Sequence, residues 1–380
     1  MNTGRAWAAI LAAIILTGTA AAADPIRIGT MFETSGAIAS LGNQGYEGAQ
    51  IAVQHINASG GIKGRPIELV QINSESDETK SVTAAKRLVE REKVVAIIGP
   101  HASGSCLAIL DTIQRADMPM ICNGASVKVA GPAAERKWVF STTITDATLV
   151  GAEIAYLKKK GISRVGVLNS DNGFGVSGRE QWERLLKENG MALVVQETFG
   201  NNDQDVTPQL SKIRAANTQA NVIWANGAAL AIALKNYRQL GIDKPVLLPN
   251  GATDPNLLRL AGEAVNGVLF AASKLSIWDQ LPDSDPQKAL FKRFVTDFHA
   301  KYKRDPSGFA GNGYDSVEIF KTVISRAGTE PAKLRDAMEQ LKGMPGVTAT
   351  FSYSPTDHYG IQPSTLTMQT VKNGKFAPAD

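Results

Sequence analysis

Two serines, Ser103 and Ser105, are the side chains whose type and spacing best suit the binding of a small anion. They follow a β-branched run at 94–99, which predicts a strand, and they open an amphipathic stretch at 105–115, which predicts a helix. Hydroxyls and unpaired backbone N–H groups at a helix start attract negative charge, so the spacing indicates a carboxylate site. Each serine alone also fits an ordinary helix N-cap.

Catalytic and metal-binding spacings are absent from the sequence. No G-x-S-x-G, H-E-x-x-H, C-x-x-C or P-loop pattern occurs, and the four histidines are scattered. The nearest cofactor motif is the formal G-x-G-x-x-G from Gly173 to Gly178, followed by Glu197 at a spacing that suits a ribose contact. Residues 169–172 separate it from the preceding strand, whereas a dinucleotide fingerprint begins in the tight turn itself. We therefore expect no enzyme activity and no cofactor, and we disfavour an NAD-dependent oxidoreductase.

The cysteines are two, Cys106 and Cys122. The chain between them predicts a helix and then a strand, a reversal that brings the thiols toward each other, and an oxidising compartment permits them to pair. The sequence leaves this disulfide open because it does not give the Cα separation.

The N-terminus predicts export. Arg5 precedes an apolar stretch at 6–16, and alanines at 21–23 supply a cleavage site, so we expect a signal peptide over 1–23 and a periplasmic mature protein. Forty basic and thirty-six acidic residues are interspersed, which indicates no nucleic-acid partner.

Alternation of β-branched runs with amphipathic stretches predicts an α/β fold with parallel sheets covered by helices. The expected strands are 26–31, 67–73, 94–99, 120–123, 165–168, 192–198, 222–225 and 246–249. Two successive groups of βα units predict two doubly wound, Rossmann-like lobes. Three late helices, at 286–302, 311–327 and 331–341, and a hairpin-like tail with strands near 348–353 and 364–372 complete them. We expect discontinuous lobes, 24–143 with 277–348 and 144–276 with 349–380, joined by a three-strand hinge.

One segment makes the interpretation specific: residues 42–70 read GNQGYEGAQIAVQHINASGGIKGRPIELV. This resembles the N-terminal signature of the leucine/isoleucine/valine-binding receptors of ABC transporters. Three more segments match in order, IGPHASGS at 98–105, PMICNGAS at 119–126 and FAGNGYDS at 309–316. The resemblance covers essentially the whole mature chain. It implies a type I periplasmic binding protein fold, a monomer, and permease and ATPase subunits as partners.

The resemblance also assigns a ligand clamp on the first lobe. Ser103 and Ser105 match the positions that hold the ligand carboxylate, and Ala125 and Ser126 match those that complete the clamp with backbone groups and a hydroxyl.

Other positions depart from the amino-acid-binding pattern. Leu41 stands where leucine-binding members place an aromatic, and Phe174 where they place a tyrosine. Asn250 corresponds to the acidic residue that meets the ligand ammonium, and a neutral amide does not balance that charge. Trp224 matches a cleft position and also fits a core tryptophan between sheet and helix.

These departures favour an apolar, aromatic carboxylate as the ligand. The first alternative is a branched-chain or other amino acid, whose ammonium would use Asp171 or Asp254. The second alternative is a ligand sensor that feeds a signalling partner.

Overall fold

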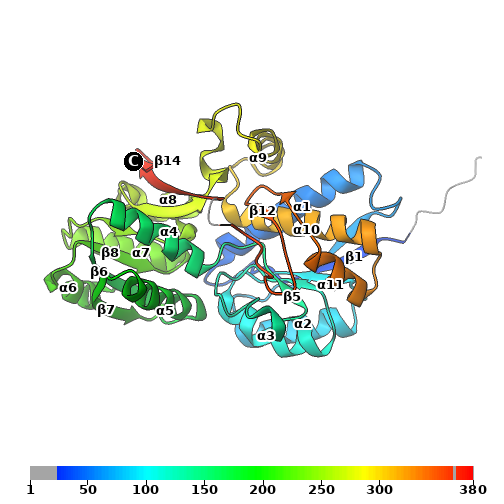
Figure 1. The fold of residues 1–380 in the computed structure, drawn as a ribbon, viewed down its shortest axis with the longest axis horizontal. Helices are drawn as coiled ribbons and strands as arrows, with labels where there is room; N and C mark the ends of the chain where they lie inside the picture. The colour runs from blue at the N-terminus through cyan, green and yellow to red at the C-terminus, as the bar shows by residue number, and fades with distance from the viewer. Residues whose placement is uncertain (1–23, 363–364, 380) are drawn as a thin grey trace, which may run out of the picture.

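The computed structural model describes residues 24–362 and 365–379, so the expected signal peptide lies outside the described residues. Two lobes lie side by side along the long axis, each built on its own β-sheet (Figure 1). The predicted α/β class with two doubly wound lobes is confirmed. No helix in the described part of the chain is long and apolar enough to cross a membrane.

The first lobe is a five-stranded parallel sheet in the order β2-β1-β3-β4-β5. Its strands are β1 (Ile26–Thr30), β2 (Ile67–Gln71), β3 (Ala96–Ile98), β4 (Met120–Ile121) and β5 (Val139–Phe140). One face is covered by α1 (Ala39–Ala58), α9 (Lys288–Tyr302), α10 (Gly308–Ala327) and α11 (Pro331–Glu339). The other face is covered by α2 (Glu78–Glu90) and α3 (Ser103–Arg115). Helices on both faces explain why β3, β4 and β5 are apolar throughout.

The second lobe is a seven-stranded sheet in the order β14-β13-β10-β9-β8-β6-β7. Its strands are β6 (Arg164–Ser170), β7 (Ala192–Phe199), β8 (Ala220–Trp224), β9 (Val246–Leu247), β10 (Leu269–Ser273), β13 (Leu366–Lys372) and β14 (Lys375–Pro378). Helices α4 (Asp146–Lys159) and α5 (Gly173–Glu188) cover one face. Helices α6 (Thr207–Ala215), α7 (Gly227–Gln239) and α8 (Pro255–Ala261) cover the other. Short elements η1 (Ala133–Glu135), η2 (Asn250–Thr253), η3 (Gly262–Val265), η4 (Lys274–Gln280), β11 (Met344–Pro345) and β12 (Thr350–Phe351) join these parts.

The predicted hairpin-like tail is wrong in its pairing. Strand β12 pairs with β11, whereas β13 pairs antiparallel with β10 and β14. Strand β10 was not expected from the sequence; as the last parallel strand of the second sheet it offers its free edge to β13. The short strand β5 and the terminal strand β14 were also not expected.

The chain passes between the lobes three times: after β5, after β10, and between β12 and β13. Phe351 and Tyr353 pack in the first-lobe core, which favours a third crossing after Tyr353. The lobe boundaries given above stay a prediction.

Helices α1 and α10 pack closely although they lie far apart in the sequence. A Cβ on Gly48 would stand 1.8 Å from the Ala310 carbonyl oxygen, and one on Gly313 would stand 1.9 Å from the Gly45 oxygen. Only glycine permits this approach. Helix α10 begins at Gly308, earlier than expected, because the Ser307 hydroxyl accepts a hydrogen bond from the Phe309 N–H.

Candidate functional site

The loops at the carboxyl ends of the two parallel sheets meet at the boundary between the lobes. Gly173, which follows β6, packs on Gly104, which follows β3: a Cβ on Gly173 would lie 3.0 Å from the Gly104 Cα. Gly227, after β8, likewise approaches the carbonyl of Ala37, after β1. Strand order reverses between β1 and β3 and again between β6 and β8, and ligands of open α/β sheets bind at such switch points. The two switch points therefore frame one site between the lobes.

The predicted clamp residues of the first lobe come together at the start of α3. The Ser103 hydroxyl accepts a 3.2 Å hydrogen bond from the Ser126 N–H. The Ser105 hydroxyl is buried without a hydrogen-bond partner among the described residues, and Ala125 lies one residue before Ser126. Hydroxyls and N–H groups therefore converge at the N-terminal end of α3, where a carboxylate is stabilised.

Ser177 of α5 brings the second lobe into this cluster. Its hydroxyl lies 2.7 Å from the Ser126 hydroxyl and also hydrogen-bonds the Asp146 carboxylate. The amides of Ala147 and Val127 donate to the other carboxylate oxygen, at 2.8 and 3.3 Å. The N-terminal turns of α4 and α5 thus meet at a buried carboxylate beside the clamp.

Asp146 is a site residue that the sequence analysis missed. Burial raises its pKa to about 6, although hydrogen bonds from Ser177 and from backbone amides act in the opposite direction. The sequence signal was its position directly after Thr145, which caps α4, at the first expected crossing between lobes. A carboxylate here would pair with a ligand ammonium and would disfavour a second buried negative charge.

Two predicted apolar residues form one stack in the second lobe. The rings of Phe174 and Trp224 lie 5.6 Å apart, 21° from parallel, and Trp182 packs edge-on against Trp224. Trp224 is fully buried in the core between the sheet and α5, while Phe174 packs in a cluster that includes Ala125 of the first lobe. The structure thus places Phe174 at the boundary between the lobes, with the Trp224 ring stacked against it.

Leu41 lies in a helix of the first lobe, and Asn250 lies beside a small cavity at the lobe boundary. Leu41 lies in the first turn of α1 and is 1% exposed. Asn250 opens η2 and lines a cavity of about 10 Å³ with Ile144, Asn312 and five other residues. That volume is roughly one water molecule. Two amides from different lobes, Asn250 and Asn312, therefore line the remaining space.

The lobes are closed on each other. Asp254, which caps α8, accepts hydrogen bonds from Ser40 at 2.8 Å and from Gln44 at 3.0 Å, both on α1. Burial raises the pKa of Asp254. This places Asp254 in a contact between the lobes, whereas Asp171, the other predicted ammonium partner, is exposed and accepts from the Asn201 N–H.

Glu33, after β1, supports the clamp loop from beneath. Its carboxylate accepts hydrogen bonds from the N–H groups of His101 and Ala102, the two residues before α3. Burial raises the pKa of Glu33 to about 7 and lowers that of His101 to about 3, so His101 is neutral near pH 7.

Cys106 and Cys122 are joined by a disulfide next to this loop. Among the described residues, no group of three or more His, Cys, Asp or Glu side chains is placed to hold a metal ion. The G-x-G-x-x-G segment lies in the first turns of α5, and its first glycine packs on Gly104 of the first lobe.

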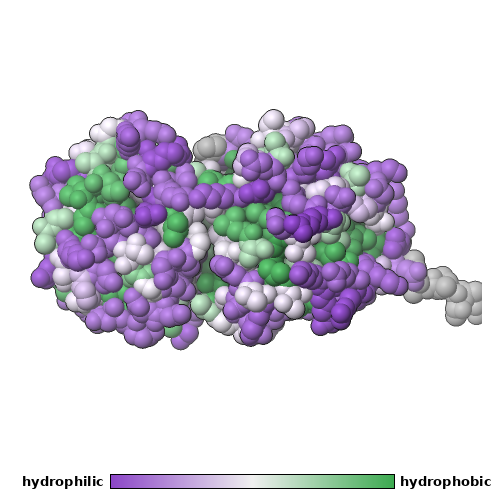
Figure 2. All heavy atoms as spheres, turned by 90° about the horizontal axis from the view of Figure 1, so that it is seen from below, coloured by the Kyte–Doolittle hydropathy of each residue, from purple (hydrophilic) through white to green (hydrophobic). Residues whose placement is uncertain are grey.

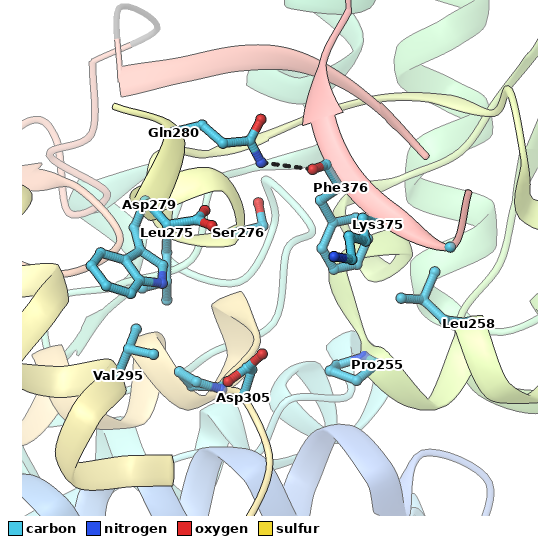
Figure 3. Close-up of a pocket in the computed structure, with 13 residues that line it drawn as sticks. Pro255, Leu258, Leu275, Ser276, Asp279, Gln280, Val295, Asp305, Lys375 and Phe376 are labelled. Carbon is cyan, nitrogen blue, oxygen red and sulfur yellow. Dashed lines mark hydrogen bonds between the residues drawn. The ribbon is translucent and has the colours of Figure 1, made fainter. Parts of the chain in front are cut away.

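A larger groove of about 370 Å³ lies apart from the predicted residues. Figure 3 shows Pro255 and Leu258 of the second lobe on one side, with Val295 and Asp305 of the first on the other. A 2.9 Å hydrogen bond from Gln280 to the Phe376 carbonyl ties η4 to β14 across it. Elsewhere the surface seen from below is mostly hydrophilic, with apolar patches on both lobes (Figure 2).

The chain is similar to known solute-binding proteins over most of its length. Residues 25–375 match the family model described as periplasmic binding protein. The chain is 24% identical over 353 residues to a Brucella suis protein named Leu/Ile/Val-binding protein homolog 7, covering 90% of this chain and 87% of that one. It is 25% identical over 337 residues to the leucine-, isoleucine-, valine-, threonine- and alanine-binding protein of Pseudomonas aeruginosa, covering 87% of each.

Solved structures show the same arrangement. The substrate-binding protein LivJ of Streptococcus pneumoniae, solved with isoleucine, superimposes with a TM-score of 0.83 at 27% identity, over 94% of this chain and 99% of that one. An extracellular ligand-binding receptor from Rhodopseudomonas palustris has the same fold, with a TM-score of 0.87 at 24% identity, over 93% and 99%.

Proposed function

The chain belongs to the periplasmic binding protein family, and we propose that it is the extracytoplasmic receptor of an ABC importer that closes its two lobes on a small organic carboxylate. The resemblance that the sequence motifs indicated is confirmed. Family, relatives and similar structures make the chain a solute-binding protein of the branched-chain amino acid transporter type rather than an enzyme.

One observation carries the proposal: the two switch points face each other, and hydroxyls from both lobes meet there. Ser103 and Ser126 come from the first lobe and Ser177 from the second, so a carboxylate between them would bind both lobes at once. A ligand that touches both lobes stabilises the closed arrangement, which is how a hinge protein captures its solute.

The ligand we favour is an apolar carboxylate with an aromatic body. Asn250 supports this because an amide does not neutralise an ammonium, and the Phe174 ring at the lobe boundary offers an apolar surface. The predicted aromatic preference rests on these residues alone.

A branched-chain or other amino acid is the second candidate, and a different observation favours it. Asp146 places a buried carboxylate beside the clamp, where a ligand ammonium would neutralise it. The names of the relatives, which refer to leucine, isoleucine and valine, also support this candidate.

A screen of ligands by thermal shift, preceded by mass spectrometry of whatever copurifies, tests the proposal. A bound ligand raises the melting temperature by mass action. Phenylacetate and benzoate should raise it more than leucine, isoleucine or valine do. A higher melting temperature with amino acids alone would leave the receptor function in place and change the ligand class. A higher melting temperature with nucleotides alone would contradict the receptor function.

The cellular setting follows from the same proposal. We expect a periplasmic monomer, exported by the leader at 1–23, that docks on a permease with ATPase subunits. A sensor that feeds a signalling partner is the alternative. Reconstitution with the permease and ATPase subunits of an ABC importer whose genes adjoin the gene for this chain, scored by ligand uptake into vesicles, separates the two.

A further inference from the structure

The disulfide lies directly beneath the first-lobe clamp. Cys106 sits in the first turn of α3, one residue after Ser105, and Cys122 follows β4, four residues before Ser126. Their Cα atoms are 6.3 Å apart, and both residues are fully buried in the core on the α2–α3 face of the sheet.

Gly124 shows how tightly the two clamp loops are packed around this bond. A Cβ on Gly124 would lie 3.0 Å from the Cys106 Sγ and 3.0 Å from the Ser103 Cα. The chain that leaves Cys122 therefore runs across the first turn of α3 at Gly124, and two residues after Gly124 it presents the Ser126 N–H to the Ser103 hydroxyl.

We propose that the Cys106–Cys122 disulfide is a positioning element that fixes the two halves of the ligand clamp, Ser103 with Ser105 and Ala125 with Ser126, relative to each other. This inference rests on the proposed function, because it assigns the bond a role in the site that binds the carboxylate. The four clamp residues belong to the first turn of α3 and to the segment after β4, and no covalent link other than this disulfide and the chain itself joins these two segments.

Without the disulfide, hydrogen bonds would hold the start of α3 and the segment after β4 together less firmly. The Asn123 N–H donates to the Pro100 carbonyl at 3.0 Å, and the Ser126 N–H donates to Ser103. Water competes for such bonds when the lobes part, whereas the disulfide persists. A clamp that is already in its binding geometry spends less conformational entropy on the ligand, so its affinity is higher.

The proposal has a consequence for where the protein is active. The thiols are reduced in a cytosol and oxidised outside it. A precursor that has not been exported would therefore have a looser clamp and a lower affinity, and full affinity would arise only after oxidation.

The test removes the disulfide while keeping the total volume of the two side chains about the same. Cys106→Ala with Cys122→Val removes the covalent link and refills the buried space, and isothermal titration with phenylacetate and with leucine measures binding. We expect the affinity for whichever probe the wild type binds to fall at least about tenfold. Leu234→Ala, in the second-lobe core at α7, is the control for lost stability alone and should retain wild-type affinity.

Amide hydrogen exchange of the ligand-free protein gives a second measurement that needs no ligand. In the double variant, exchange should quicken at 102–106 and 122–127 and should stay unchanged in the second lobe. Wild-type affinity in the double variant, or unchanged exchange in those two segments, would overturn the proposal. If the wild type itself binds neither probe, the proposed ligand class fails, while the exchange measurement still decides whether the bond positions the loops.

Discussion

The hydroxyl oxygens of Ser126 and Ser177 lie 2.7 Å apart, so a hydrogen bond joins the two lobes at the centre of the candidate site. Ser126 comes from the loop after β4, and Ser177 from the second turn of α5. A ligand that binds the clamp must part these hydroxyls and then satisfy both, so lobe opening precedes entry.

Ser103→Ala tests the clamp. The change removes a hydroxyl at the start of α3, and a hydrogen bond to a charged group contributes roughly 1.5–3 kcal/mol, so ligand affinity should fall about ten- to a hundredfold. Titration calorimetry with the best binder among phenylacetate, benzoate and leucine measures this. Ser211→Ala on α6, which removes a hydroxyl bonded only to the Thr207 carbonyl, should leave binding unchanged.

Asn250→Glu tests the ligand's charge. A carboxylate beside the small cavity should repel an acid and favour an amino acid, so phenylacetate affinity should fall and leucine affinity should rise. Asn202→Glu, on the exposed surface of the second lobe, controls for the added charge. Tight leucine binding by the wild type, with no aromatic acid bound, would contradict the argument from Asn250 and leave the receptor assignment in place.

Asp146→Asn distinguishes the same two ligand classes by removing a negative charge rather than adding one. Loss of a buried negative charge should strengthen binding of an acid and weaken binding of an amino acid. Because the pKa of Asp146 is raised to about 6, acid binding by the wild type should also be stronger at pH 5.5 than at pH 7.5, and the variant should lose that dependence. Asp243→Asn, an exposed carboxylate paired with Lys244, should change neither quantity.

Asp254→Asn tests the contact that holds the lobes together. Asparagine still caps α8, but its Nδ2 replaces one carboxylate oxygen and does not accept a hydrogen bond. The contact with Ser40 and Gln44 is therefore weaker, and the ligand-free protein should open further. Small-angle scattering should record a larger radius of gyration than in the wild type, and saturating ligand should restore it. Asp77→Asn is a matched control, because Asp77 caps α2 within the first lobe by accepting from the Lys80 N–H.

The buried acids make stability depend on pH. The pKa values of Glu33 and Asp315 are raised to about 7 by burial, so the folded state holds protons there that the unfolded state has released. Their contribution to stability should therefore fall as the pH rises from about 4.5 to about 7 and should level off above that. The lowered pKa of His101 acts in the opposite sense, below about pH 6.5. Calorimetric melting temperatures from pH 4.5 to 8 measure the fall, and Glu33→Gln should reduce it.

Much of the fold could be predicted because its signals are local. The β-branched runs and amphipathic stretches located eight strands and the main helices within a few residues. Strand β10, with the sequence LFAAS, was missed because it is short and lacks the β-branched residues that mark a strand. The pairing of β13 was missed because it depends on that strand.

The site was less accessible to prediction. Ser103 and Ser126 come together as the motifs implied, but the sequence says nothing about which residues of the second lobe meet them. Ser177 and Asp146 lie 31 residues apart, and only the packing of α4 on α5 brings their side chains into contact. The sequence left Trp224 between a cleft position and a core position, and in the structure its ring is fully buried and stacks on Phe174.

The contact between α1 and α10 also sets an order of assembly. The core of the first lobe contains residues of α1, which lies near the beginning of the chain. It also contains residues of α9, α10 and α11, which follow more than 200 positions later. A growing chain that has reached the end of β10 therefore carries every parallel strand of both sheets, yet α1 still lacks the cover of α9 and α10. The second lobe then lacks only β13 and β14 at one edge. The lobe made first along the chain is thus the one completed last, and a polypeptide truncated before residue 308 should remain unfolded in its N-terminal part.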